Sequence, residues 1–412
     1  MELALIILLA VFLLIAVRQV GRFRFRIWQV MCAGAVAVLI TGQISFPDAV
    51  RSINIDVMVF LFGMFIVGEA LSESGYLFTI SKSLVSYCSN SWQFIVLFIF
   101  SMALLSAFLM NDTMAIIGTP FALYLGRRLG LSIKMLLLSL CFAITTGSLM
   151  SPIGNPQNLL IATECGYTNP FGTFLLYLGI PTIISLVLLV FFIRLFYPQD
   201  SGKNLCIMED VPLADPELAR ILIISLTLIT SCIILQVLLT LHPFGVVYSV
   251  PLPVIAIAGA APVILLSRKR VEIIRKIDWP TLVFFIAMFV LMAAVFTTGF
   301  FQAAVPAAAA SSVFLLYTTS LLISQFISNV PFVALFTPLL QQAGMSVNET
   351  MALAAGSTLA GNLTILGAAS NIIVIQNAER QGETITFMEF IRFGIPFALV
   401  TGVVFVVWLT FV

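Results

Sequence analysis

The sequence has little charge, a single histidine and no cysteine pair with metal-ligand spacing. Charged residues make up 9% of the 412 residues and the net charge is +1, so the charge gives no reason to expect nucleic acid as a partner. His242 is the only histidine and the six cysteines form no CxxC pair, which argues against a metal centre of that kind. Without an HExxH motif or paired aspartates, we expect no enzyme activity and no cofactor. The GxxxxGK[ST] motif is also missing, so transport driven by ATP would require a separate ATPase subunit.

What the sequence does have is apolar residues. They make up 61% of the chain, with a mean hydropathy of +1.15, which is more than a soluble fold can bury. Many runs reach about 20 apolar residues, the length that crosses a bilayer. The first run, residues 3–17, follows Glu2 and precedes a basic stretch from Arg18 to Arg26. Because a signal peptide carries its positive charge in front, we predict a retained first helix.

Two stretches of the sequence repeat each other. Asn111 lies in LSAFLMND and is followed by a Thr-Pro pair, and Asn329 lies in ISQFISNV and is followed by another, 218 residues later (329 − 111). Gly154 recurs as Gly367, 213 residues later (367 − 154). Two copies of one unit with polar, glycine-containing breaks predict a secondary transporter, because such breaks place backbone and amide groups at the membrane midplane.

We predict an all-α polytopic membrane protein with two inverted repeats, residues 1–198 and 218–412, joined by a cytoplasmic linker at 199–217. Each repeat is expected to hold five transmembrane helices, one of them broken at the midplane, and one re-entrant hairpin. The hairpins are predicted at 92–126 and 312–343 and the broken helices at 134–164 and 350–378. The other predicted spans are residues 3–17, 28–45, 56–78, 172–197, 219–241, 247–267, 280–302 and 386–411.

Basic residues indicate which loops face the cytoplasm. With loops 18–27 and 268–279 inside, Arg51 is the one basic residue of 19 that lies outside, and both termini lie outside the plasma (inner) membrane. Residues 92–126 would also return inside as two full spans, but arms of about 15–18 residues are short for spans. An odd number of crossings inverts the second half, so the two hairpin tips are expected to meet near the midplane.

The polar residues of the tips and breaks are the predicted substrate- and ion-binding residues, because freed backbone groups there can bind an ion or solute in place of water. Asp112 is an acid at the midplane and is predicted to carry a proton. The alternative is that Asp112 caps the second helix of its hairpin. Glu69 is a further acid inside a span, and its alternative is to reach the membrane interface. The predicted site residues are Ser106, Asn111, Asp112, Thr113, Gly154, Asn155, Asn158, Ser324, Ser328, Asn329, Gly367 and Asn371.

These motifs resemble the ion transporter superfamily, and most closely its arsenite-permease-like branch of anion permeases. The resemblance rests on FLMND at 108–112, GSLMSPIGNPQN at 147–158 and SNVP at 328–331, and it covers almost the whole chain. It implies a site at each tip and its facing break, with Na⁺ at Ser324, Ser328 and Asn329. It also implies an elevator-like movement and a homodimer. The sodium-coupled dicarboxylate relatives carry a serine where this chain has Met110, whose thioether is a poor ligand for a hard cation.

Three transport functions follow as hypotheses. The first is a proton-coupled permease for a small inorganic oxyanion or for arsenite or antimonite, with Asp112 as the proton carrier. Because no basic residue falls at either tip, the sequence favours a neutral or weakly charged solute. The second is a sodium/proton antiporter that exchanges both ions at Asp112. The third is a sodium-coupled symporter of dicarboxylate or sulfate.

Overall fold

The computed structural model describes residues 2–17, 19–20, 23–24, 26–200, 213–241, 250–300, 312–342, 344 and 346–412. These residues are helical apart from one antiparallel pair of two-residue strands, β1 (Gln19–Val20) and β2 (Phe23–Arg24). Seven helical segments among them are long and apolar enough to cross a membrane. Large apolar side chains such as Leu176 and Phe191 stand exposed on these segments, as expected where lipid is the solvent. The protein is an all-helical membrane protein.

The first half of the chain contains a hairpin and a broken helix where they were predicted. The hairpin consists of α6 (Ser91–Leu109) and α7 (Asn111–Leu129). The broken helix consists of α8 (Ile133–Gly147), the 3₁₀ turn η1 (Ser148–Met150) and α9 (Pro156–Glu164). The other elements are α1 (Glu2–Val17), α2 (Ile27–Ile40), α3 (Phe46–Arg51), α4 (Ile55–Ser74), α5 (Tyr76–Ser86), α10 (Pro170–Phe196) and η2 (Pro198–Asp200).

The second half also contains a hairpin followed by a broken helix. Its hairpin consists of α17 (Val313–Ile327) and α18 (Asn329–Gln342). Its broken helix consists of α19 (Val347–Leu363), the 3₁₀ turn η3 (Ile365–Gly367) and α20 (Ala369–Glu379). The other elements are α11 (Pro216–Leu241), α12 (Leu252–Leu266), α13 (Arg270–Lys276), α14 (Trp279–Phe296) and α21 (Phe387–Phe411).

Some boundaries differ from the prediction. The helix expected over 56–78 ends at Ser74, because Gly75 adopts a left-handed conformation with φ 69° and α5 starts after it. The short helices α3 and α13 occupy stretches predicted as loops. The arms of the first hairpin are 19 residues each, longer than expected, so arm length does not distinguish a hairpin from two spans. The predicted linker at 199–217 lies mostly outside the described residues.

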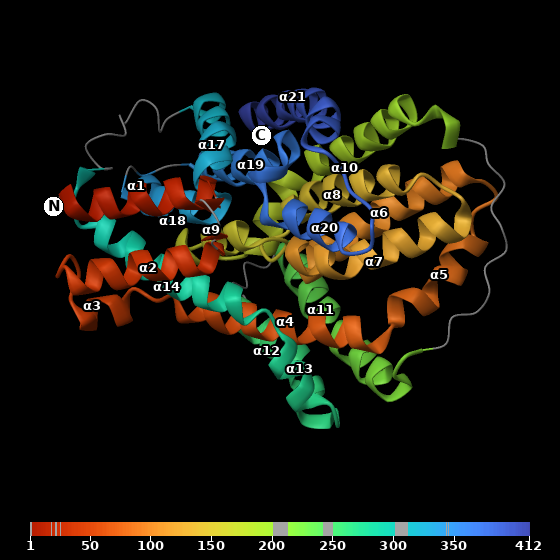
Figure 1. Ribbon diagram of the computed structural model, residues 1–412, viewed down its shortest axis with the longest axis horizontal. Helices are drawn as coiled ribbons and strands as arrows, with labels where there is room; N and C mark the ends of the chain where they lie inside the picture. Colours follow the sequence, from red (N-terminus) through yellow and green to blue (C-terminus); the bar gives the residue numbers. More distant parts are fainter. Residues whose placement is uncertain are drawn as a thin grey trace.

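The helices pack in groups that combine the two halves (Figure 1). α4 packs against α11 and α12, and α14 packs against α1 and α2. α17 and α21 both pack against α19, and α6 packs against α8. The second helix of each hairpin packs against the broken helix of the other half, α7 on α20 and α18 on α9.

Each break requires a glycine, because the backbone of the preceding helix lies directly against it. A Cβ added to Gly154 would lie 2.1 Å from the carbonyl oxygen of Ser148, and one added to Gly367 would lie 2.0 Å from that of Ala360. These distances are far below van der Waals contact, and the atoms that would have to move are backbone. The two glycines that correspond in the sequence therefore have the same packing role.

Replacing either glycine by alanine should destabilise the protein. We expect Gly154→Ala and Gly367→Ala each to cost about 1–3 kcal/mol, since backbone must shift to admit the methyl group. Gly179→Ala is the matched control, because the nearest atom to its added Cβ belongs to the flexible Leu175 side chain, at 3.1 Å. Thermal unfolding in detergent can be followed with a thiol-reactive dye that reports exposure of the buried Cys141. Midpoints equal to that of the control would contradict the close packing.

Candidate functional site

The tip of the first hairpin is held in place by hydrogen bonds. Met110 joins α6 to α7 with φ 69° and ψ 143°, a strained conformation for a residue other than glycine, and its side chain is fully buried. The backbone N–H of Asn111 donates to the carbonyl oxygen of Gly154 at 2.8 Å, and its Nδ2 donates to Ser370 Oγ at 3.4 Å. The hydroxyl of Ser106 donates to the carbonyl of Ile144 at 2.7 Å. The first tip is therefore attached to both broken helices.

The tip of the second hairpin has the same backbone but a different attachment: Gln325 Nε2 donates to the carbonyl of Ala360 at 2.9 Å, and Gln325 Oε1 accepts from the hydroxyl of Thr364 at 2.7 Å. Ser328 joins α17 to α18 with φ 73° and ψ 147°, nearly the values of Met110. Among the described residues, no backbone hydrogen bond joins Asn329 to Gly367. Asn329 Oδ1 and Ser324 Oγ are both buried without a hydrogen-bond partner there, as is Asn111 Oδ1 at the first tip. Buried polar atoms are normally paired, so these oxygens are candidates to contact a ligand or ion.

At each of the two breaks, an asparagine donates hydrogen bonds to nearby backbone carbonyls, and the two asparagines correspond in the sequence. Asn158 Nδ2 donates to the carbonyls of Ser148 at 3.2 Å, Leu149 at 3.4 Å and Ser151 at 3.1 Å, and Asn371 Nδ2 donates to that of Gly361 at 2.6 Å. These amides satisfy carbonyls that the interrupted helices leave free.

The N-termini of the two half-helices differ. Asn155 Oδ1 caps α9 by accepting from the N–H of Asn158 at 2.8 Å. Ala368 stands at the start of α20 and provides no side-chain cap. The free N–H groups of α20 are consequently available to an anion, which a helix N-terminus attracts.

Parts of both tips and both half-helices meet at one cavity of about 850 Å³. Asp112 comes from the first tip, Ser328 from the second, Pro156 from the start of α9 and Ala369 from the start of α20. Asp112 and Ser328 are the two predicted site residues that line it, and Thr113 lines a neighbouring cavity. The rest do not line this cavity: Ser106, Asn111, Gly154, Asn155, Asn158, Ser324, Asn329, Gly367 and Asn371.

Asp112 lies in the first turn of α7. The residue at the cap position is Met110, which has no side-chain capping bond, and Asp112 makes no hydrogen bond to a described group. The bonds expected from a capping role are therefore not present in this part of the chain. Asp112 lines the large cavity together with residues of α14 and α20.

The sequence reasoning missed the basic residues of this cavity. Arg26, which precedes α2, and Arg380, at the end of α20, both line it, as does Asp278 at the start of α14. Arg380 could have been found by spacing, since Ala369, Ile372, Ile373 and Gln376 lead to it along one face of α20. Arg26 lies far in the sequence from the hairpins and breaks that line the cavity, so no local sequence pattern could identify it.

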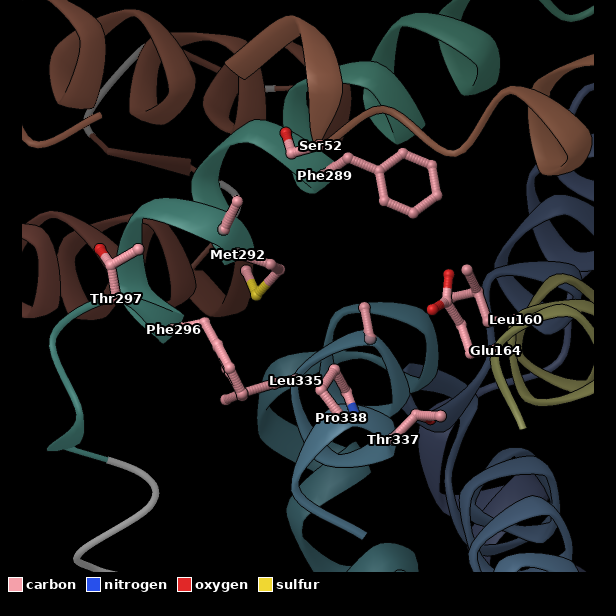
Figure 2. Close-up of a pocket in the computed structure, with 12 residues that line it drawn as sticks. Ser52, Leu160, Glu164, Phe289, Met292, Phe296, Thr297, Leu335, Thr337 and Pro338 are labelled. Carbon is pink, nitrogen blue, oxygen red and sulfur yellow. The ribbon is translucent and has the colours of Figure 1, made fainter. Parts of the chain in front are cut away.

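Two smaller cavities flank the hairpins at corresponding positions. One, of about 310 Å³, lies between the C-terminal half of α14, the end of α9 and α18 (Figure 2). Phe289, Met292 and Phe296 line it on one side, with Leu335 and Pro338 opposite and Glu164 to the side. The other, of about 320 Å³, lies between α4, α7 and the start of α14. Ile116 and Ile117 line it where Ala334 and Leu335 line the first, again 218 residues apart (334 − 116).

Within the described residues, no group of three or more His, Cys, Asp or Glu side chains could hold a metal ion. The oxygens at the tips are hydroxyls, amides and one carboxylate. Such groups suit a hard cation, a proton or a hydrogen-bonded solute.

Known proteins resemble the chain along nearly its whole length. The "Uncharacterized transporter Rv2684" of Mycobacterium tuberculosis is 29% identical over 424 residues, covering 97% of this chain and 95% of that protein. The "P protein" of Sus scrofa is 25% identical over 490 residues, covering 97% of this chain and 58% of that protein. Among solved structures, the YdaH transporter of Alcanivorax borkumensis has a TM-score of 0.57 at 16% identity, over 99% of this chain and 97% of that one. The chain thus has a YdaH-like transporter fold.

A match to a family model shows which family the chain belongs to. The model described as "CitMHS: Citrate transporter" matches residues 9–350, most of the chain. This agrees with the expected superfamily, while the arsenite-permease-like branch stays a prediction. A transporter family implies a small solute as substrate and no enzyme activity. The chain belongs to the CitMHS citrate transporter family, and it is a membrane transporter.

Proposed function

We propose that the protein is a secondary active transporter that moves an anion across the membrane together with protons, and that Asp112 carries the proton. The observation that carries this proposal is the cavity of about 850 Å³ at which both hairpin tips and both half-helices meet. A carboxylate there faces a space large enough for a small solute. An intramembrane acid that lines a cavity is the usual location for a coupling proton.

The charges around the cavity favour an anionic solute over a neutral one. Arg26 and Arg380 line it together with Asp112 and Asp278, so the lining carries a net positive charge when the coupling proton is on Asp112, and the uncapped start of α20 adds N–H groups. An anion is therefore a better candidate substrate than neutral arsenite. The family description names citrate, so a carboxylate is the first substrate to test, and inorganic oxyanions such as sulfate are the second.

We further propose that the two halves are inverted repeats and that transport is an elevator-like movement of the hairpin regions. The matched backbone of Met110 and Ser328 and the two corresponding side cavities support the repeat. In the proposed orientation, the end of the large cavity at Arg26 and Arg380 opens to the cytoplasm.

Sodium coupling is the second candidate. Ser324 Oγ and Asn329 Oδ1 are buried without partners in the described part of the chain, and such oxygens are suitable ligands for Na⁺. The two coupling schemes make different predictions for the same residue, Asp112.

Substituting Asp112 by asparagine should abolish proton movement. The amide keeps the shape of the carboxyl group but cannot release a proton at neutral pH. We expect wild-type proteoliposomes with an internal pH dye to show a proton flux when citrate, sulfate, phosphate or arsenite is added, and Asp112→Asn to show none. Asp48→Asn is the control, since Asp48 is exposed and pairs with Arg51.

The other outcomes separate the alternatives. A proton flux evoked by Na⁺ alone would favour the sodium/proton antiporter. Anion uptake driven by a Na⁺ gradient, with Asp112→Asn still active, would show that Asp112 does not couple transport.

Removing the amide of Asn329 should weaken substrate or ion binding, while removing that of Asn111 should mainly destabilise the tip. The Asn329 side chain makes no hydrogen bond to a described residue, whereas Asn111 Nδ2 donates to Ser370 Oγ at 3.4 Å; the bond to Gly154 comes from the backbone N–H of Asn111 and survives the substitution. We expect Asn329→Ala to raise KM by about tenfold, the effect of one lost hydrogen bond to a charged partner. Initial uptake rates against substrate or Na⁺ concentration measure this. Equal KM values for Asn329→Ala and wild type would argue against a ligand role.

A further inference from the structure

Glu69 is an acid within a candidate membrane span for which the proposed function has no use. It lies on α4 within the apolar candidate span Ile55–Ser74 and is half-buried. It makes no hydrogen bond or ion pair with any described residue. An unpaired carboxyl group in such a segment costs folding free energy, so its presence there indicates a function.

Glu69 lines the side cavity of about 320 Å³ between α4 and α7. Ser72, Thr113, Lys276 and Asp278 line the same cavity. The space is large enough for several water molecules, and these side chains provide the hydrogen-bond partners that buried water needs. Protons can move along such a chain of water and carboxyl groups.

The side cavity adjoins the large one. Asp278 and Pro280 line both, so the start of α14 forms their common wall. The first turn of α7 also lies between them, with Thr113 in the side cavity and Asp112 in the large one. Asp278 is close enough for its charge to act on Asp112. Its own oxygens accept from the N–H of Thr281 at 3.2 Å and the hydroxyl of Thr281 at 2.6 Å, so it caps α14.

At its other end the side cavity reaches the surface at α13. Lys276 Nζ lies 2.8 Å from Glu272 and 2.7 Å from Glu73, and its side chain is 43% exposed. Hydrogen bonds to Glu272 and Glu73 raise the pKa of Lys276, so it remains protonated. The charged groups that act on Glu69 are Glu73 on its own helix and Lys276 and Glu272 on α13. Because Lys276 already pairs with two carboxylates, Glu69 stays free to take up a proton.

We propose that Glu69 passes the coupling proton between the surface at α13 and Asp112, along the two adjoining cavities. In each step an O–H bond breaks on one carboxyl group or water as another forms on the next, and no electrons are gained or lost. Glu69, left as a carboxylate, is reprotonated from the aqueous surface at α13. This inference rests on the proposed proton coupling at Asp112.

The test compares net transport with exchange in proteoliposomes. Net uptake of an anion with protons requires the coupling proton to leave Asp112 in each cycle, whereas exchange of labelled for unlabelled anion does not. We expect Glu69→Gln to reduce net uptake and proton flux by at least about tenfold, as loss of a positioned proton carrier does, while exchange stays within about twofold. Glu69→Asp should restore part of the flux. Asp56→Asn, at the exposed start of the same helix, is the control and should behave as wild type.

Each other result overturns the route. An unchanged proton flux in Glu69→Gln, with the flux lost in Asp112→Asn, would leave the coupling in place and remove Glu69 from it. An equal loss of exchange and net uptake in Glu69→Gln would give Glu69 a structural or binding role instead. Wild-type protein that shows no proton flux with citrate, sulfate, phosphate or arsenite would overturn the proton coupling and the route together.

Discussion

The requirement that every backbone polar group inside a membrane be satisfied governs this structure. Two helices are interrupted within apolar sequence, and the carbonyls they free accept bonds from Asn158 and Asn371. Gly154 and Gly367 let the backbone turn back closely enough for those bonds to form. Where protein groups satisfy the backbone polar groups, the break is held by the protein itself. Where polar groups are left over, as at the start of α20, the surplus faces a cavity and is available to a solute.

The hairpin and the broken helix therefore differ in their bonding between the two halves. The first tip bonds Gly154 and Ser370, and its half-helix is capped by Asn155. The second hairpin is bonded to its own break through Gln325, and its half-helix has no side-chain cap. We interpret the first unit as mainly a support and the second as the part that meets the solute, with Asp112 the contribution of the first half to the shared cavity.

The sequence predicted the elements well because its signals are local. Apolar length, the GSLMSPIGNPQN stretch at 147–158 and the separation of 218 residues between Asn111 and Asn329 place the hairpins and breaks within a few residues, whereas the helix end at Gly75 was not predicted. The cavity could not be predicted in the same way. Arg26 and Arg380 reach it only through packing between distant helices, and no local pattern tells that Asn111 Nδ2 donates to Ser370 while no corresponding bond from Asn329 is found among the described residues. Deciding which polar residues face a ligand required knowing which had already found partners.

The packing of each hairpin on the other half also sets the order in which the protein can assemble. Asn111 and Ser370 are separated by 259 residues, and α9 receives α18 from far along the chain. The first hairpin is synthesised long before its partner α20 exists, so Asn111 can bond Gly154 early but must wait for its bond to Ser370. The proposed transport site, which combines residues of both halves, is thus a late product of folding.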